Sequence, residues 1–529
     1  MKISIEKLAL SAEKLPASID RELYEYIASY CGVKISDILD YAITRRSIDA
    51  RKQSDVKLVY SLTADLKDSA RPKRSLEPAA PDMPFDMPSF SYAEPPLHPV
   101  IVGAGPAGLF CALILAMAGC KPVILDRGRD VGRRKNDIDR FLQTRELNEE
   151  SNLLFGEGGA GTWSDGKLFT RIRDPRIRFV LREMIAAGAP EGIAYYSHPH
   201  VGSDLLPQVI AGLREKIISL GGIFRWNTRA EGLLVRDEIC RGVRLADGEN
   251  LEAPLVVNAC GHSAREFILS VIDAGAAYRM KGFQIGCRIE HPQDFINWFQ
   301  FGIQETLPAL GSAEYNLVSR PSPDGRTGGA TTFCMCPGGE VIPATPVRNR
   351  LCTNGMSNSA RSGRFANAAI VTNIEPDTFP SPQEAYAFLD RLEQKMFEAG
   401  GGDYTCPAQK ASDFLRGNAG RLLRHSSWPF GLKEARVDAL LPETVSRTIR
   451  RALIHFDRVA PGYVRYGTLL GAETRVSSPV RFERDDISRE SSLCNLYPAG
   501  EGAGLAGGIT SSAIDGILTA EAILKKHAK

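Results

Sequence analysis

Residues 99–109 read Pro-Val-Ile-Val-Gly-Ala-Gly-Pro-Ala-Gly-Leu. The apolar run from Val100 to Val102 is typical of a buried parallel strand, and three glycines follow it in G-x-G-x-x-G spacing. An apolar stretch long enough for a helix comes next and ends at Gly119. A second apolar strand then leads to Asp126. This order of strand, glycine turn, helix and strand predicts the first unit of a Rossmann-like domain.

Each glycine of the turn has its own physical role. Gly103 permits the tight turn, and Gly105 has no side chain, so a pyrophosphate can approach the backbone. Gly108 lets the helix pack closely on the strand. The N–H groups and the positive dipole end of the helix then face the phosphates. Asp126 stands about 20 residues further on, where a carboxylate can bind ribose hydroxyls. The pattern therefore predicts a bound dinucleotide.

Two further glycine-rich stretches point to the same site. Residues 155–168 read Phe-Gly-Glu-Gly-Gly-Ala-Gly-Thr-Trp-Ser-Asp-Gly-Lys-Leu. Glycine at this density excludes a helix or strand interior, and the interleaved Phe155 and Trp163 do not suit a solvated linker. We therefore expect this backbone to approach a flat or charged ligand. Residues 496–510 read Leu-Tyr-Pro-Ala-Gly-Glu-Gly-Ala-Gly-Leu-Ala-Gly-Gly-Ile-Thr, a short apolar strand and a glycine loop before a predicted helix.

Composition narrows the class of protein. The chain has 529 residues, 43% of them hydrophobic and 24% charged, as in ordinary globular proteins. A net charge of +2 favours neither nucleic acid nor a membrane surface. No apolar run reaches the roughly 18 residues of a membrane span, and the first residues carry no apolar signal core. The eleven cysteines are scattered and show no metal-ligand spacing. We expect a cytoplasmic protein with reduced thiols and no bound metal.

The chain divides into five segments by composition and pattern, and their order predicts an α/β protein. The segments are a small N-terminal α+β module at 1–66, a proline-rich linker at 67–97, the first part of the Rossmann-like domain at 98–278, a mixed α+β substrate or cap domain at 279–465, and the C-terminal part of the Rossmann-like domain at 466–529.

The N-terminal module is expected to have the order β-α-α-β. Ser18 can cap a first helix that ends at Gly32. A second helix is expected to start at Ser36 and to carry the basic residues Arg45, Arg46, Arg51 and Lys52. This basic face is either a solvated helix surface or a binding face for RNA or another partner, and solvated surface is the commoner reason for such a charge run.

Two features of the expected substrate domain are open to more than one interpretation. Cys334 and Cys336 are separated by one residue, and neither redox dithiols nor zinc sites favour that spacing, so we expect buried structural thiols. The segment from Arg416 to Arg458 has nine basic and four acidic residues. It forms either an anion-binding surface or a solvated helix face.

Glu473 and Arg475 are candidate catalytic residues. In an extended segment they share one face, where they would contact a substrate or the bound cofactor. A salt-bridged structural strand explains the same pattern equally well.

These motifs resemble a known family. The flavoprotein form of the fingerprint is recognisable in Gly103-Ala-Gly-Pro-Ala-Gly108, and Asp126-Arg-Gly-x-x-Val-x-x-Arg134 resembles its extension in the glutathione-reductase superfamily. Together with Glu473-Thr-Arg-Val-Ser-Ser-Pro479 and Gly500-Glu-Gly-Ala-Gly504, they resemble the bacterial family of uncharacterised FAD-dependent dehydrogenases over nearly the whole chain. The resemblance implies FAD and a Rossmann-like FAD-binding domain interrupted by the substrate or cap domain. It implies no particular substrate.

The resemblance also assigns residues to the cofactor. The implied FAD-binding residues are Gly103, Ala104, Gly105, Pro106, Ala107, Gly108, Asp126, Arg127, Arg134, Gly159, Ala160, Gly161, Thr162, Gly261, Gly500, Glu501, Gly508 and Ile509. Glu501 stands where the superfamily usually has Asp, and its longer side chain is still expected to reach the ribityl chain. The helix after Gly508 is implied to face the flavin N1–C2 region, where its dipole stabilises negative charge.

Three hypotheses for function remain. The first is an FAD-dependent oxidoreductase acting on a small molecule, with an anionic compound as one candidate class. The second is a flavoenzyme of RNA modification with the N-terminal module as an RNA arm, which the near-neutral charge disfavours. The third is a non-catalytic FAD-binding scaffold. Only one dinucleotide fingerprint is present, so electrons would come from the substrate, from transient NAD(P)H or from another protein. The lack of a Cys-x-x-x-x-Cys pair beside the flavin motifs argues against disulfide reduction.

Overall fold

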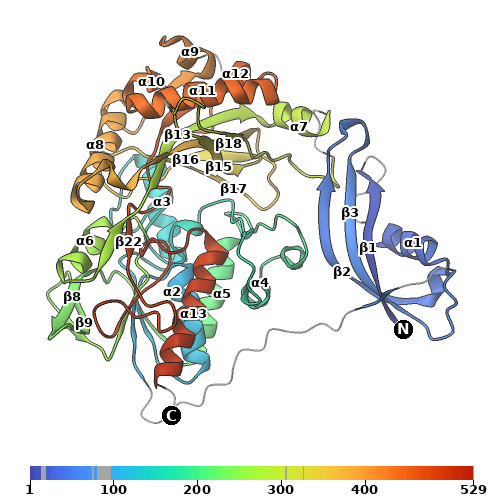
Figure 1. The fold of residues 1–529 in the computed structure, drawn as a ribbon, viewed down its shortest axis with the longest axis horizontal. Coiled ribbons are helices and arrows are strands. Elements are labelled where there is room, and N and C mark those ends of the chain that lie inside the picture. The colour runs from blue at the N-terminus through green and yellow to red at the C-terminus, as the bar shows by residue number, and fades with distance from the viewer. Residues whose placement is uncertain are drawn as a thin grey trace.

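The computed structural model describes residues 1–12, 19–73, 77–79, 97–303, 307–325, 327–422 and 425–527. The chain forms a small N-terminal module, a Rossmann-like domain and a second domain built on a large mixed sheet (Figure 1). No helix within these ranges is both long and apolar enough to cross a bilayer.

A parallel five-stranded sheet forms the centre of the Rossmann-like domain, with strand order β23-β11-β5-β6-β7. Its strands are β5 (Val100–Val102), β6 (Val123–Leu125), β7 (Ile223–Arg225), β11 (Val256–Asn258) and β23 (Leu496–Pro498). The last strand comes from the C-terminal segment and pairs with β11, which also pairs with β5. The sheet is therefore completed only after the chain returns from the second domain, and the expected interrupted Rossmann-like fold is confirmed.

Helices pack together on one face of this sheet, where they share a core with Ile101, Ile124 and Val257. They are α2 (Pro106–Met117), α3 (Val131–Thr144), α4 (Arg176–Ala186), α5 (Leu206–Ser219) and α13 (Ile509–His527). Helix α2 is buried along almost its whole length, and α13 packs directly against it. A Cβ atom at Gly516 of α13 would lie only 2.1 Å from the Ala107 carbonyl oxygen of α2. The two helices therefore approach as closely as glycine allows.

A small antiparallel sheet of β8 (Ala230–Arg236), β9 (Ile239–Leu245) and β10 (Asn250–Glu252) extends the Rossmann-like domain, and α6 (Arg265–Asp273) packs on it. The two-stranded pair β12 (Tyr278–Met280) and β22 (Val480–Phe482) marks both crossings into the second domain. The chain thus leaves and re-enters the Rossmann-like domain on adjacent strands.

The second domain is built on a seven-stranded sheet with order β14-β15-β18-β13-β21-β19-β20. Its strands are β13 (Phe283–Pro292), β14 (Val318–Ser319), β15 (Ala330–Cys336), β18 (Phe365–Ile374), β19 (Cys406–Lys410), β20 (Leu432–Glu434) and β21 (Thr468–Glu473). Its other elements are the hairpin β16 (Gly339–Pro343) and β17 (Thr353–Ser357), and the helices α7 (Gln293–Phe301), α8 (Pro382–Gly400), α9 (Ala411–Arg416), α10 (Val437–Leu440), α11 (Glu443–Val459) and α12 (Tyr463–Tyr466). Helices α8 and α11 pack on this sheet, and α8 also contacts α6 of the Rossmann-like domain. Because β21 is an inner strand of this sheet, the domain boundary expected at residue 465 falls too early.

The N-terminal module differs from its expected order. It contains β1 (Lys2–Ser11), α1 (Asp20–Cys31), β2 (Ile38–Asp49), β3 (Lys57–Leu66) and β4 (Glu77–Pro78), in the sheet order β2-β3-β1-β4. Helix α1 ends at Gly32 in the left-handed conformation, as expected, while its expected cap Ser18 lies outside the described residues. The first residues of the expected linker contribute β4, which pairs with β1.

The expected second helix of this module is wrong, because its residues form β2. The strand pairs with β3 along its whole length, and bulges shift the register between Ile38 and Asp40 and between Ile43 and Arg45. A bulge interrupts the alternation of inward and outward residues, which removes the sequence signal of a strand.

Strand β2 also joins the module to the Rossmann-like domain. The Arg46 N–H donates to the Tyr195 carbonyl at 2.8 Å, and the Ser197 N–H donates to the Arg46 carbonyl at 2.9 Å. The Arg46 guanidinium lies 4.7 Å from the centre of the Tyr196 ring and donates at 2.5 Å to the Ala309 carbonyl. Arg45 Nε also donates to Ser197 Oγ at 3.3 Å, so two of the four basic residues noted in the sequence serve in docking.

The close approach of α2 and α13 gives a test of the fold. Gly516→Val should lower the free energy of unfolding by about 2–3 kcal/mol, because the side chain would overlap the Ala107 carbonyl. Thermal unfolding checks this, with Lys525→Val at an exposed position of the same helix as the matched control. Equal unfolding temperatures for the two variants would contradict the close packing.

Candidate active site

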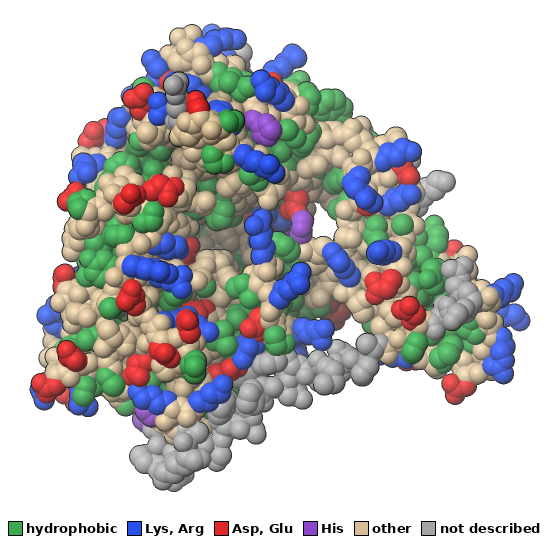
Figure 2. Space-filling view, in the orientation of Figure 1, with side chains coloured by type: hydrophobic (Ala, Val, Ile, Leu, Met, Phe, Trp, Pro, Cys, Tyr) green, Lys and Arg blue, Asp and Glu red, His purple; other side chains and the backbone are tan. Residues whose placement is uncertain are grey.

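A cavity of about 610 Å³ lies between the Rossmann-like domain and the seven-stranded sheet. Its floor comes from the glycine turn after β5, the glycine-rich loop at 156–167 and the start of α13. Its roof comes from the second domain, with Gln284, Cys334 and Asn354 among the lining residues. Figure 2 shows the surface hollowed between the two domains, with acidic and basic side chains interspersed around it. The volume is typical of a site for a cofactor and a small ligand.

The glycine turn has the geometry that the sequence predicts. Gly103 has φ 104°, a conformation that favours glycine, and a Cβ at Gly108 would lie 1.9 Å from the Gly103 carbonyl oxygen. A Cβ at Gly105 would meet nothing within 4 Å, so the backbone there borders open space. Within the described residues, no side chain caps α2, whose N-cap is Gly105. An uncapped helix start beside open space fits a pyrophosphate.

Asp126 fixes this turn. Its carboxylate accepts hydrogen bonds from the Ala104 and Gly128 N–H groups, both at 2.9 Å. Burial raises its pKa, and these two bonds oppose that effect. Asp126 also lines the cavity, where it could reach a ribose. Its binding of the ribose stays a prediction. The neighbouring Arg127 guanidinium lies 4.0 Å from the centre of the Phe155 ring.

The glycine-rich loop is held from behind by a buried arginine. Arg134 donates from Nε to the Asn152 carbonyl at 2.7 Å. Its Nη1 donates to three loop carbonyls, those of Gly156, Glu157 and Gly159, at 2.6–3.1 Å. Arg134 does not line the cavity, so it positions the loop rather than facing a ligand.

Glu157 supports the same loop from a buried position. Its Oε2 accepts from the Val131 N–H at 2.7 Å and from Arg214 at 2.8 Å. Its Oε1 is buried with no partner among the described residues. Burial raises the pKa of this carboxyl to about 7, against the opposing effects of the Val131 N–H and Arg214.

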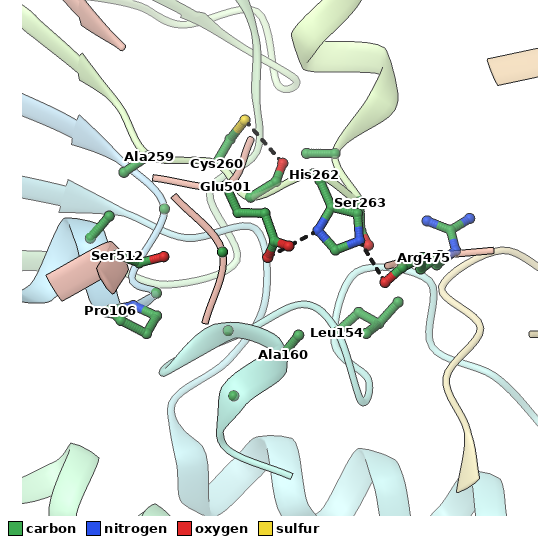
Figure 3. A pocket seen from close by; sticks show the side chains of 18 of the residues that line it. Pro106, Leu154, Ala160, Ala259, Cys260, His262, Ser263, Arg475, Glu501 and Ser512 are labelled. Atoms are coloured by element: carbon green, nitrogen blue, oxygen red, sulfur yellow. Dashed lines mark hydrogen bonds and ion pairs between the residues drawn. The ribbon is translucent and has the colours of Figure 1, made fainter. Parts of the chain in front are cut away.

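Glu501 and His262 both line the cavity, and their side chains face each other there (Figure 3). The Glu501 carboxylate lies 3.3 Å from His262 Nδ1, and His262 Nε2 lies 2.9 Å from the Arg475 carbonyl oxygen. Because a carbonyl only accepts, Nε2 carries a proton and the ring orientation is fixed. Glu501 lines the cavity, and its contact with His262 links it to the Arg475 backbone of the second domain. Sequence analysis missed His262, although it follows the predicted Gly261 directly.

The structure brings most of the predicted cofactor residues together around the cavity. Those that line it are Gly103, Gly105, Pro106, Ala107, Asp126, Arg127, Gly159, Ala160, Gly161, Gly261, Glu501, Gly508 and Ile509. Those that lie behind the wall are Ala104, Gly108, Arg134, Thr162 and Gly500. Gly500 is anchored there through its N–H, which donates to Asp515 at 2.8 Å.

The two candidate catalytic residues are both held in buried ion pairs. Glu473 accepts two bonds from Arg288, at 2.8 and 2.9 Å, and Arg475 donates to Glu393 at 2.9 Å. Both residues line the cavity. Both side chains are therefore salt-bridged, as one of the two interpretations of this segment expects. Their catalytic role stays a prediction.

The two cysteines of the second domain differ from each other. Cys336 is fully buried, as expected, whereas Cys334 is only partly buried and lines the cavity. The expectation of two buried structural thiols is therefore wrong for Cys334. A register shift in β15 between Phe333 and Cys336 causes the difference, because it breaks the alternation on which the expectation rests.

The open space at Gly105 gives a test of the cofactor site. Gly105→Leu should lower the flavin content of the purified protein more than tenfold, because its side chain would fill the space that a pyrophosphate needs. The residue has φ −77°, which leucine adopts without strain, so the flavin-free variant should unfold at the same temperature as flavin-free wild type. Met117→Leu, at the exposed end of the same helix, is the matched control. Full flavin content in Gly105→Leu would place the cofactor elsewhere.

Glu157 gives a test by pH. A carboxyl with a raised folded pKa contributes most below its unfolded pKa and loses that contribution as the pH rises toward 7. The unfolding temperature of wild type should therefore fall relative to that of Glu157→Gln between pH 5 and pH 8. Glu215→Gln, an exposed carboxylate on the same Arg214, should show no such trend. A difference independent of pH would mean that Glu157 is not buried as described.

Comparisons with known proteins agree with this architecture. Residues 282–476 match a family model described as FAD-dependent protein, C-terminal domain-like, and residues 101–154 match an NAD(P)-binding Rossmann-like domain. Residues 2–65 match a domain of unknown function. The cofactor is FAD, because the cavity fits it and the model matching the second domain is that of FAD-dependent proteins.

Solved structures and a curated relative were also found. The FAD complex of glycerol-3-phosphate dehydrogenase from Bacillus halodurans is 11% identical, with a TM-score of 0.37, over 82% of this chain and 66% of that chain. Glycine oxidase from Bacillus cereus is 10% identical, with a TM-score of 0.35, over 82% of this chain and 98% of that chain. An uncharacterized protein of Clostridium beijerinckii is 38% identical over 98% of this chain and 99% of its own length. The chain therefore belongs to the same family as this clostridial protein.

Proposed function

We propose that the protein is an FAD-dependent oxidoreductase of the glutathione-reductase superfamily that moves a hydride between the flavin and a small molecule. The observation that carries the proposal is the cavity's roof. A site that only bound FAD would need no more than the floor that the Rossmann-like domain forms. Here the second domain adds a polar roof above that floor. Bound FAD supplies two-electron chemistry at N5. The chain's own residues bind and orient the substrate and exclude water.

The roof is polar but electrically balanced. Arg288 neutralises Glu473, and its Nη2 donates to Asn354 Oδ1 at 3.2 Å. The Gly355 N–H also donates to Asn354 Oδ1, at 2.8 Å, which leaves the Asn354 NH2 group as the part of that amide able to donate to a substrate. Gln284 brings a second amide from β13. Two amides suit a carbonyl or hydroxyl group of a small polar substrate.

Charge at the cavity does not by itself select an anionic substrate. Lys167 lines the cavity, but its Nζ lies 2.6 Å from Asp165. Asp165 also accepts from Arg361 Nε at 2.9 Å, and these two cations lower the pKa of Asp165 despite its burial. Glu314 Oε2 lies 4.0 Å from Lys167 Nζ and 3.6 Å from Arg361 Nη1, so two carboxylates balance the two cations. Lys167 can therefore orient a carbonyl or carboxylate oxygen at the edge of the cavity, but its charge is compensated.

Electron supply follows from the single dinucleotide fingerprint. With one Rossmann-like unit of this kind in the sequence, NAD(P)H would act transiently at the same cavity that admits the substrate. The open boundary between the domains gives a place for it (Figure 2). In this scheme NAD(P)H and the substrate occupy the cavity one after the other.

Anaerobic absorbance spectroscopy tests the proposal. The purified protein should show flavin bands that bleach with NADH, NADPH or one compound of a panel of small hydroxy, carbonyl and unsaturated metabolites. Gln284→Ala should slow bleaching by the active compound at least tenfold without lowering the flavin content, because it removes a roof amide and leaves the floor intact. Phe169→Ala, which alters the cavity wall without removing an amide, is the control.

Two results would overturn the proposal. One is the absence of flavin after reconstitution with FAD. The other is a flavin that no nicotinamide cofactor and no compound of the panel reduces.

A further inference from the structure

Cys334 occupies a position in β15 that aims it into the cavity. The strand carries a register shift between Phe333 and Cys336, and Cys334 has φ 44°. A non-glycine residue in the left-handed region is strained, and bulges of this kind commonly redirect a side chain beside an active site. This strained conformation lies in β15, which forms part of the roof of the cavity. It places the Cys334 thiol among the groups that line the cavity.

The bulge also brings Cys336 to Cys334. In a straight strand, residues two apart are separated by about 6.6 Å, and their side chains stand side by side without meeting. Here the Cys336 thiol donates a hydrogen bond to the Cys334 carbonyl oxygen, with Sγ 3.3 Å from that oxygen. Cys336 is fully buried behind Cys334. One sulfur thus faces the chamber while the second stands directly behind it.

The charges around this pair favour a thiolate at Cys334. The neighbouring Cys336 side chain lowers the pKa of Cys334 to about 7, and Arg288 and Lys167 act in the same direction, against burial and Asp165. Cys334 in turn raises the pKa of Cys336. An outer thiolate and an inner thiol are the arrangement that thiol–disulfide exchange uses.

The remaining cysteines near the cavity do not share these properties. Cys260 also lines the cavity, but burial raises its pKa to about 12. Cys352 is fully buried and its pKa is raised to about 11. Among the described residues, Cys334 is the cavity-lining cysteine with a lowered pKa.

We propose that Cys334 and Cys336 form a redox-active dithiol that reacts with a low-molecular-weight disulfide in the roof of the cavity. Cys334 is the attacking sulfur and Cys336 is the resolving one. The proposal is independent of the proposed function, because the exchange uses only these two side chains and the disulfide.

The exchange balances in two steps. The Cys334 thiolate attacks one sulfur of R–S–S–R, whose S–S bond breaks, so that a mixed disulfide forms and RS⁻ leaves. Cys336 then attacks the Cys334 sulfur, its proton passes to the first RS⁻, and the second RS⁻ leaves. The protein dithiol loses two electrons and becomes an intramolecular disulfide, and the small disulfide gains them and becomes two thiols.

The test uses 4,4′-dithiodipyridine, a small neutral disulfide whose released thiopyridone absorbs light, on the full chain. All proteins carry Cys494→Ser, which removes the exposed thiol. The parent should release two thiopyridones in a fast phase and retain no adduct, with a Cys334–Cys336 disulfide seen by peptide mass mapping. Cys336→Ser should release one and keep one adduct on Cys334. Cys334→Ser should lose the fast phase.

Three outcomes would overturn the proposal: no fast phase in the parent, a stable adduct on Cys334 in the parent, or the same fast phase in Cys334→Ser. Flavin content and unfolding temperature show that each variant is folded. Repeating the reaction in flavin-free Gly105→Leu separates this test from that of the proposed function, because the exchange should persist there. Alkylation of Cys334 by iodoacetamide should also have its pH midpoint near 7, and this midpoint should shift upward in Cys336→Ser.

Discussion

The close contact of α2 with its neighbours is the constraint on which the site depends. On one side Gly108 brings the helix against the Gly103 carbonyl, and on the other Gly516 brings α13 against Ala107. A side chain at Gly108 would push α2 away from the turn, and one at Gly516 would push α13 away from α2. Either change would displace a helix start that borders the cavity. The N-terminus of α2 and the N-terminus of α13 come from opposite ends of the sequence. Glycine contacts at the centre of the domain therefore bring both halves of the FAD site into one cavity.

The roof is tied to the floor by buried ion pairs rather than by apolar packing alone. Arg265 of the Rossmann-like domain donates at 2.9 Å to Glu393 of α8, which also accepts from Arg475. On the other side of the cavity, Asp165 of the glycine-rich loop pairs with Arg361 of the second domain. Removing one partner of such a pair leaves a buried charge, which costs about 3–5 kcal/mol. The pairs therefore fix the relative position of the two domains more strictly than an apolar contact of the same area would.

Sequence and structure agree best where the chemistry is local. The spacing of Gly103, Gly105 and Gly108 is set by sterics within one turn, so it could be interpreted without knowing the rest of the fold. The sequence of β2 suggests a helix because a bulge near Ile43 interrupts the alternation of inward and outward residues that is typical of a strand. The amides of Gln284 and Asn354 carry no local signal at all, since only the packing of β13 and the β16–β17 hairpin in the second domain places them above the floor.

Cys334 shows why the roof escapes sequence analysis. Two cysteines one residue apart predict a straight strand with parallel side chains, and in such a strand neither sulfur would differ from the other. The register shift in β15 makes them different, because it sends one sulfur to the cavity and leaves the other behind it. The carboxylates around the chamber already have cationic partners, as Glu473 has in Arg288 and Asp165 has in Lys167. A thiolate at Cys334 would share those same two cations rather than pair with one of its own, so it stays available to attack a disulfide that enters the cavity.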